Sequence, residues 1–205
     1  MAKHVKNFIY KDKNLFSMLA RTNVATKEQV ETFMGIRRAE SHIKDGLIEK
    51  AILVIKDSGE EARTIEVYRL TEEGKGVVRE RCNISSMYAS NSVRHDLALT
   101  HSYIELFNRD SSLVDRWVTE NDYKVMLQER VLELREAGRD READQMEADI
   151  ERKRYSAPDG GYRDAEGRIH SIEITTRYYK EETIVAKANT IQALGITSCN
   201  EIYIN

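Results

Sequence analysis

Apolar residues in the first part of the chain recur at helical spacing over three short segments. The segment Lys13–Ala20 carries its apolar residues on one helical face. Thr26, followed by acidic and amide residues, is typical of the cap and first turn of a second helix. A third helix is expected from Ile36 to Asp45, because Gly46 is the residue type that most often ends a helix in a left-handed conformation. The pattern therefore predicts three helices joined by tight turns.

Two strand-like segments follow these helices. Ala51–Lys56 and Thr64–Leu70 are rich in β-branched and other apolar residues, and the polar sequence DSGEEA joins them. We expect the two segments to pair as a hairpin. Thr71 then has the position of a helix cap, so another helix should follow the second strand.

The next part of the chain predicts a helix, a strand and a helical hairpin. Apolar residues stand at helical spacings in SVRHDLALTHSYIELFNR, whereas the apolar run in SLVDRWVTEND is typical of a strand that ends in acidic residues. An alanine- and glutamate-rich stretch with one break, Ala137-Gly138, then predicts a helical hairpin inserted at about residues 122–154. Its apolar residues are too sparse for a core of its own, so the hairpin should pack against its domain or against a second copy of the chain.

The C-terminal part of the chain changes to short strands. GGYRD, a turn at AEG and RIHSIEITT predict a hairpin in which Ile172 and Ile174 share one face and Glu173 points to the other. A helix over EETIVAKANTIQAL and a final strand, EIYIN, follow. Without the inserted hairpin the order is helix, strand, strand, strand, helix, strand. These patterns assign the chain to the α+β class.

Length, charge and cysteine content narrow the functional class. The 205 residues suffice for two domains, which we place at 1–90 and 91–205. A net charge of -3 argues against a protein that coats nucleic acid through bulk charge, although residues 1–90 hold 16 Lys and Arg against 13 Asp and Glu. Two distant cysteines, no apolar signal segment and no long apolar run favour a soluble cytoplasmic protein that has no zinc site and no membrane contact.

The first domain resembles a bacterial winged helix-turn-helix over residues 13–82, in its element order and in the sequences DGLIEKAILV and VYRLTEEGKGVV. The resemblance implies that the third helix enters the major groove of double-stranded DNA and that the wing holds phosphates. The implied DNA-binding residues are Arg37, Arg38, Ser41, His42 and Lys44 on the helix, and Lys56 and Arg63 on the wing. The alternative is an ordinary solvated helix face, and winged helices also bind proteins.

The second domain resembles the PD-(D/E)xK nuclease core, because the pair Pro158-Asp159 precedes one strand and Glu173 lies inside the next. Together with the winged helix, the sequences RHDLALT, WVTE, PDGGY and IEITT look similar to the replication-relaxation proteins of plasmids and integrative elements. The resemblance implies that Asp159 and Glu173 hold Mg²⁺, which activates a water molecule for attack on a phosphodiester.

One position departs from the nuclease pattern. The lysine expected two residues after the second carboxylate is replaced by Thr175, which cannot carry a positive charge, so the standard centre is incomplete. Lys187 on the following helix is the first candidate for the missing cation and Lys180 the second, and Glu105 or Glu120 is a candidate for a third carboxylate.

Three functions fit these observations. The leading hypothesis is a DNA-binding accessory protein of a mobile genetic element, acting in a relaxosome or at a replication origin beside a relaxase or a replication initiator, a role that the resemblance alone implies. The second is a Mg²⁺-dependent DNA endonuclease that uses Asp159, Glu173 and Lys187 as catalytic residues. The third is a transcriptional regulator or protein-interaction module, with the helical hairpin as its binding surface. The alternative to a metal site is that Asp159 only starts a turn and that Glu173 faces solvent or pairs with Arg177 or Arg168. All three fit a homodimer, because two-fold winged-helix proteins match palindromic sites.

Overall fold

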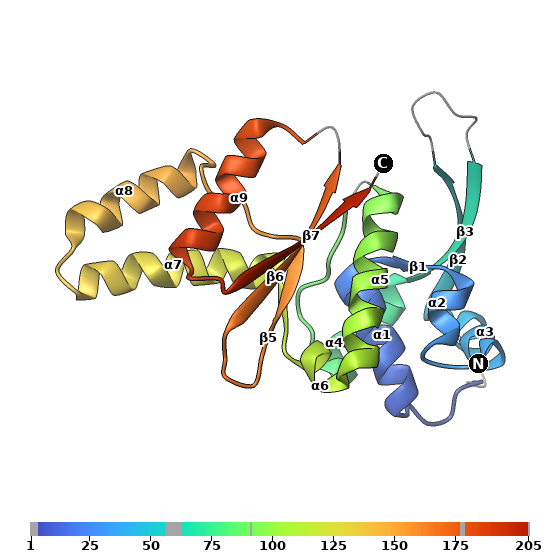
Figure 1. Ribbon diagram of the computed structural model, residues 1–205. Coiled ribbons are helices and arrows are strands. Elements are labelled where there is room, and N and C mark those ends of the chain that lie inside the picture. The colour runs from blue at the N-terminus through green and yellow to red at the C-terminus, as the bar shows by residue number, and fades with distance from the viewer. Residues whose placement is uncertain (1–3, 56–62, 91, 177–178, 205) are drawn as a thin grey trace. The chain divides into compact units, whose positions relative to one another are not determined.

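The computed structural model describes residues 4–55, 63–90, 92–176 and 179–204. The chain has two compact units, Met1–Arg109 and Asp110–Asn205, whose elements are labelled in Figure 1. It is an α+β protein, in which the described residues form nine helices, a three-stranded antiparallel sheet and a four-stranded mixed sheet. Within these residues no helix is both long and apolar enough to cross a membrane.

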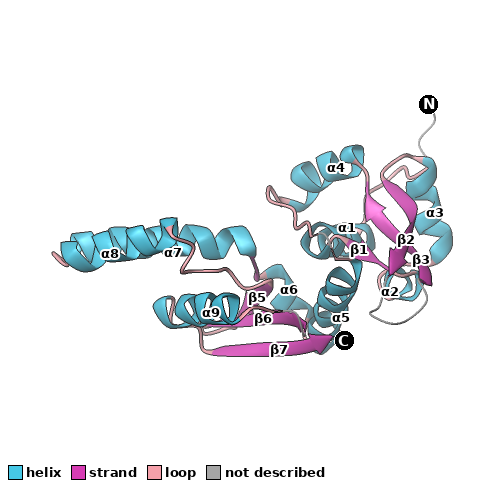
Figure 2. Cartoon of the chain, turned by 90° about the horizontal axis from the view of Figure 1, so that it is seen from above, coloured by secondary structure: helices cyan, strands magenta, loops and turns pink. Residues whose placement is uncertain are grey.

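The first unit combines helices with the three-stranded sheet. Its elements are α1 (Tyr10–Thr22), β1 (Val24–Ala25), α2 (Lys27–Glu31), α3 (Ile36–Lys44), β2 (Ile48–Ile55), β3 (Arg63–Leu70), α4 (Glu72–Cys82) and α5 (Val93–Arg109). Strand β3 is central, with β1 and β2 antiparallel to it on either side. Figure 2 shows this sheet and α3 from above. The predicted helices and hairpin are confirmed, and the first hairpin strand begins earlier than expected, at Ile48.

Local signals fix the ends of these elements as the sequence predicts. The side chain of Thr26 accepts a hydrogen bond from Gln29 N–H and caps α2. Thr71 accepts one from Gly74 N–H and caps α4 in the same way. Gly46 follows α3 with a φ of 73°, which is the left-handed conformation expected at the end of that helix.

Helix α5 lies in the first compact unit, which extends to Arg109, whereas the predicted domain boundary lies after residue 90. Thr100 Oγ1 donates a hydrogen bond to Val24 O over 2.6 Å. The rings of Tyr103 and Phe107 lie 6.4 and 4.8 Å from the ring of Phe33. These contacts hold α5 against β1 and α2. The helical periodicity of this segment indicated a covered face, but it could not identify which elements cover it.

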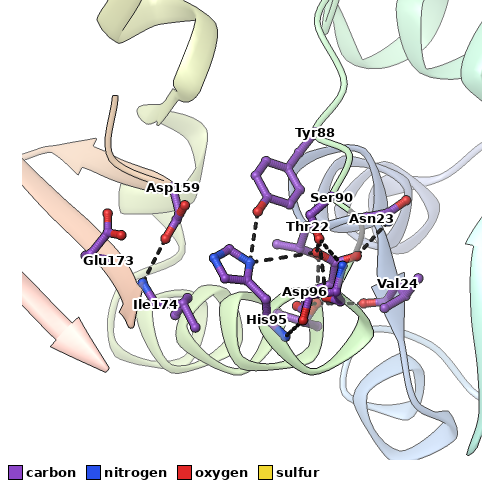
Figure 3. A network of polar contacts seen from close by, with 12 residues as sticks. Thr22, Asn23, Val24, Tyr88, Ser90, His95, Asp96, Asp159, Glu173 and Ile174 are labelled. Carbon is purple, nitrogen blue, oxygen red and sulfur yellow. Dashed lines mark hydrogen bonds and ion pairs between the residues drawn. The ribbon is translucent and has the colours of Figure 1, made fainter. Parts of the chain in front are cut away.

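A buried polar network also joins α5 to the end of α1 (Figure 3). The carboxylate of Asp96, which is 2% exposed, accepts hydrogen bonds from Asn23 Nδ2 at 2.7 Å and from the hydroxyl of Ser90. Tyr88 Oη lies 3.0 Å from His95 Nδ1, and their rings stack. The segment between α4 and α5 is therefore anchored within the first unit.

The second unit is built on the mixed sheet. Its elements are α6 (Ser111–Asp115), β4 (Trp117–Thr119), α7 (Glu120–Glu136), α8 (Asp140–Glu151), β5 (Gly160–Arg163), β6 (Ile169–Thr176), α9 (Glu181–Ala193) and β7 (Ser198–Ile204). The strand order is β4-β5-β6-β7, with β4, β5 and β6 antiparallel in turn and β7 parallel to β6. Figure 2 shows α9 running alongside β6 and β7. The predicted order of two strands, a helix and a final strand is confirmed.

The strand expected over residues 112–122 is much shorter than predicted, because two helices take up its ends. Asp110 accepts a hydrogen bond from Ser112 N–H and caps α6, so the chain is helical up to Asp115. Thr119 accepts one from Asp122 N–H and caps α7. Only Trp117–Thr119 pairs with β5.

Helices α7 and α8 form the predicted helical hairpin, which turns at Gly138 with a φ of 69°. Five buried residues of the two helices form one apolar cluster: Leu127, Val131, Leu134, Ala143 and Met146. Ala193 and Leu194, at the end of α9, pack against this cluster. The hairpin thus packs against its own unit, which is one of the two predicted alternatives, and Val125 and Leu132 of α7 remain exposed.

Two glycines let strand β5 pass between bulky side chains. A Cβ atom on Gly160 would lie 2.5 Å from the Trp117 ring, and one on Gly161 would lie 2.2 Å from Tyr123 Oη. Tyr123 Oη donates a hydrogen bond to Gly160 O over 3.2 Å. Close packing on both faces fixes β5 immediately after Asp159 and so positions this carboxylate.

Candidate functional site

Two acidic residues of the second unit lie on the same face of the mixed sheet. Asp159 immediately precedes β5, and Glu173 lies within β6. Asp159 Oδ2 accepts a hydrogen bond from Ile174 N–H over 2.8 Å, which ties the aspartate to the strand that carries the glutamate. Figure 3 shows this bond and the Glu173 side chain beside it. The two carboxylates that sequence analysis selected are therefore brought together.

Lys187 of α9 supplies a cation to both acids. Its Nζ lies 3.5 Å from Asp159 Oδ1 and forms an ion pair with Glu173 Oε1. Lys187 is only 8% exposed and Glu173 only 4%. Of the two candidate lysines, Lys187 therefore reaches the acids, whereas Lys180 stands at the residue before α9. Thr175 lies near β7, with its hydroxyl 3.5 Å from Ile202 O.

Tyr179 completes the contacts of this acid–lysine site, which we define as Asp159, Glu173 and Lys187. Its hydroxyl donates a hydrogen bond to Glu173 Oε1 over 2.7 Å, and its ring centroid lies 5.4 Å from Lys187 Nζ. Glu173 Oε2 is buried and has no hydrogen-bond partner among the described residues. Tyr179 was not among the predicted site residues. Its neighbour Tyr178 lies outside the described residues.

The protonation of Glu173 is sensitive to its surroundings. Burial and the nearby Asp159 carboxylate raise the pKa of Glu173 to about 7, although Lys187 and Tyr179 act in the opposite direction. Burial dominates because an ionised carboxylate loses its hydration inside the protein. A carboxyl group with a pKa raised in this way by burial and a second acid is common at functional sites.

The donor atoms fit one small hard cation. Mg²⁺ is commonly held by one or two carboxylates and completes its coordination with water and phosphate oxygens. Glu173 Oε2, which lacks a partner, and the Asp159 carboxylate are the oxygens that would serve. A third carboxylate is not in place, and the described residues contain no group of three or more His, Cys, Asp or Glu arranged to hold a metal. Glu105 pairs with His101, and Glu120 pairs with Lys124.

The α3 residues that were predicted to contact DNA lie on two different faces of the helix. Arg37 and Lys44 are exposed and Ser41 is partly exposed. His42 is completely buried, so its assignment to the exposed face is wrong. Arg38 points the same way as His42 and donates two hydrogen bonds to Asp12, from Nε at 2.6 Å and from a terminal nitrogen at 2.5 Å. The side chain of Arg38 is therefore held by contacts within the first unit.

Asp12 of α1 is a buried functional group that sequence analysis missed. Its carboxylate is 0% exposed, lies 2.9 Å from His42 Nε2 and accepts the N–H of Ile9 over 2.7 Å. Burial would raise the pKa of Asp12, but the hydrogen bonds from Arg38, Ile9 and His42 outweigh it and lower the pKa. An acidic residue among the apolar positions of α1 was the signal that could have revealed this ion pair.

The two residues that the winged-helix resemblance places on a wing are only partly covered by the structure. Lys56 lies outside the described residues, and Arg63 is an exposed residue at the start of β3. The strand β2 carries two strongly exposed apolar side chains, Ile52 at 73% and Val54 at 55%. This part of the hairpin therefore offers apolar surface in addition to the cation at Arg63.

Comparisons with known proteins give no relative of this chain: no protein family, no curated protein and no solved structure matches it.

Proposed function

We propose that this chain is a DNA-binding protein whose second unit cleaves phosphodiester bonds with the help of Mg²⁺. One observation carries the proposal: Lys187 Nζ contacts both Asp159 and Glu173. The cation that Thr175 cannot supply thus comes from α9. The order of strands supports the same conclusion, because an antiparallel β4-β5-β6 followed by a parallel β7 agrees with the nuclease core that the sequence resembles.

The residues of the site have separate roles in this proposal. Asp159 and Glu173 would hold the metal, and Mg²⁺ supplies an activated water and stabilises charge on the attacked phosphate. Lys187 keeps a positive charge beside the two acids and orients the attacked phosphate or the water. Tyr179 holds Glu173 Oε1 in place through its 2.7 Å hydrogen bond. Glu173 must be ionised to bind the metal, so its raised pKa predicts activity that increases as the pH rises through about 7.

The first unit would bring the DNA to this protein as a winged helix. Its order α1, β1, α2, α3, β2, β3 and its antiparallel sheet support that assignment. Arg37, Ser41 and Lys44 form the outward face of α3 and are the residues we assign to the major groove. Arg63 is the described wing residue that can hold a phosphate.

Supercoiled plasmid incubated with Mg²⁺ or Mn²⁺ tests the cleavage. The proposal predicts nicked or linear product with the wild-type chain and none with Asp159→Asn or Glu173→Gln, because each change removes a metal oxygen. Glu136→Gln is the matched control, since Glu136 is an exposed acid at the end of α7. Cleavage by both site variants, or loss of cleavage by the control variant, would overturn the assignment.

A gel-shift series in increasing salt tests the DNA-binding face. Arg37→Ala should weaken binding to a specific site by about 1–3 kcal/mol if Arg37 reads a base, and Lys44→Ala should reduce the salt dependence if Lys44 contacts a phosphate. Glu31→Ala, at the end of the neighbouring helix α2, is the control. If neither α3 variant changes the affinity or its salt dependence, α3 does not contact DNA.

The second candidate is a DNA-binding accessory protein that does not cleave, with a relaxase or a replication initiator as partner. The contacts among Lys187, Glu173 and Tyr179 favour it, because they already satisfy most of the polar atoms of the site without a metal. In that case the wild-type chain binds DNA but leaves supercoiled plasmid intact in both metals. The site changes would then lower stability alone.

A further inference from the structure

The first unit contains a pocket of about 700 Å³ beside the end of α3. Its walls come from the segment before α1, from the end of α3 and from α4. This volume lies in the range of roughly 300–1,000 Å³ typical of small-molecule sites. The apolar part of the lining consists of Val5, Phe8, Leu47 and Val77.

Three cationic side chains from separate segments also line the pocket. Lys6 precedes α1, Lys44 is the last residue of α3, and Arg81 lies near the end of α4. The ion pairs formed among the described residues include none of these three cations. Their convergence on one pocket costs electrostatic energy that a bound anion would offset.

The acidic residues of the pocket offset part of this charge but not all of it. Asp45 accepts hydrogen bonds from the N–H groups of His4 and Val5, at 2.7 and 2.8 Å. The bond from His4 is the main reason that the pKa of Asp45 is lowered. Its carboxylate is thus held by the segment before α1, and Glu80 is the other acid of the lining, so three cations face two acids and one positive charge is in excess.

A buried nitrogen in the lining also lacks a partner. His42 lines the pocket and is completely buried, and its Nδ1 has no hydrogen-bond partner among the described residues. The opposite ring nitrogen, Nε2, lies 2.9 Å from Asp12. An unsatisfied buried polar atom is costly, but Nδ1 has no exposed surface, so a molecule in the open pocket does not supply the missing partner.

We propose that this pocket binds a small organic acid with an apolar body. The carboxylate meets Arg81 and Lys44, because a guanidinium can hold a carboxylate through two parallel hydrogen bonds. The apolar body packs on Phe8 and Val77, which removes apolar surface from contact with water. An organic cation is disfavoured by the three lysine and arginine side chains, and a bare inorganic anion would leave the apolar lining in contact with water.

Binding at this pocket would also affect α3. Lys44 belongs both to the pocket lining and to the outward face of α3. An acid that engages Lys44 removes one of the cations available to DNA, so we expect it to weaken DNA binding. This consequence rests on the proposed function of the first unit, whereas binding of the acid does not.

Isothermal calorimetry on the full chain with 3-phenylpropanoate tests the proposal, with 3-phenylpropanamide as the uncharged compound of the same shape. The acid should bind saturably with one site per chain, and the amide should bind about tenfold more weakly or not at all. No saturable heat with the acid at about 1 mM, or equal affinity for acid and amide, overturns the proposal.

Variants locate the binding in the pocket. Arg81→Gln removes the guanidinium, and Val77→Trp fills the apolar part of the pocket. Each variant should bind the acid more weakly by about tenfold or more. Arg79→Gln is the matched control, because Arg79 is an exposed arginine of the same helix outside the pocket lining. Circular dichroism checks that each variant is folded. Acid binding that neither pocket variant weakens contradicts the site, and calorimetry gives this answer even for a protein that binds no DNA.

Discussion

Lys187 and Asp159 are 28 positions apart in the sequence, yet Lys187 Nζ lies 3.5 Å from Asp159 Oδ1. The same ammonium group forms an ion pair with Glu173. One cation on α9 therefore balances two acids held by β5 and β6. The acids repel each other and lose hydration on burial, so both the stability and the proposed chemistry of the second unit depend on this balance.

The raised pKa of Glu173 should make stability depend on pH. The folded value of about 7 is above the ordinary value of 4.5, so this group stabilises the fold fully below about 4.5, and the contribution is lost as the pH rises through 7. The loss should be on the order of 3 kcal/mol, because one pKa unit corresponds to about 1.4 kcal/mol. Urea unfolding of the wild type and of Glu173→Gln at pH 5 and pH 8 measures it. The wild type should lose more stability than the variant, and parallel changes in the two proteins would refute the raised pKa.

Neighbouring arginines of α3 should behave differently when each is replaced. Arg38→Ala removes the bidentate partner of the buried Asp12 carboxylate and should lower the free energy of unfolding by roughly 2–4 kcal/mol. Arg37→Ala changes an exposed side chain and should alter it by no more than about 0.5 kcal/mol. Denaturant unfolding of the two variants checks this difference. Equal stability of both would mean that the contact between Arg38 and Asp12 contributes nothing to the fold.

Gly160 should be intolerant of any side chain. In Gly160→Ala the added Cβ would meet the Trp117 ring at 2.5 Å, and the strain should cost about 1–3 kcal/mol. Gly76→Ala is the control, because a Cβ there meets nothing within 4 Å and alanine favours the helix interior of α4 by about 0.5–1 kcal/mol. Thermal unfolding should therefore shift in opposite directions for the two variants. An unchanged melting temperature for Gly160→Ala would show that β5 can move away from Trp117.

Periodicity and cap residues were sufficient to predict most elements of this chain. Thr26, Thr71 and Gly46 mark helix ends through local hydrogen bonds or backbone conformation, which depend on only a few neighbouring residues. The strand expected around Trp117 is shorter than predicted, because Asp110 and Thr119 begin helices on either side of it.

The candidate site was predictable only in part. Asp159 and Glu173 follow a recognisable motif, but the choice of Lys187 over Lys180 depends on how α9 lies on the sheet. Arg38 and His42 were expected on the exposed face of α3 together with Arg37, Ser41 and Lys44. The sequence could not show that both side chains turn to Asp12, because Asp12 lies on another helix. Such long-range contacts also decided the position of α5.

The rate of plasmid cleavage by Lys187→Met tests the central claim most directly. Methionine retains most of the length and apolar stem of lysine but has no charge, so the two acids stay in place while the proposed catalytic cation is lost. With Mg²⁺ at saturating concentration, the account predicts that the wild type nicks supercoiled plasmid and that Lys187→Met is slower by about a hundredfold or more. Equal cleavage by the two folded proteins, or no cleavage by the wild type in either Mg²⁺ or Mn²⁺, would contradict it.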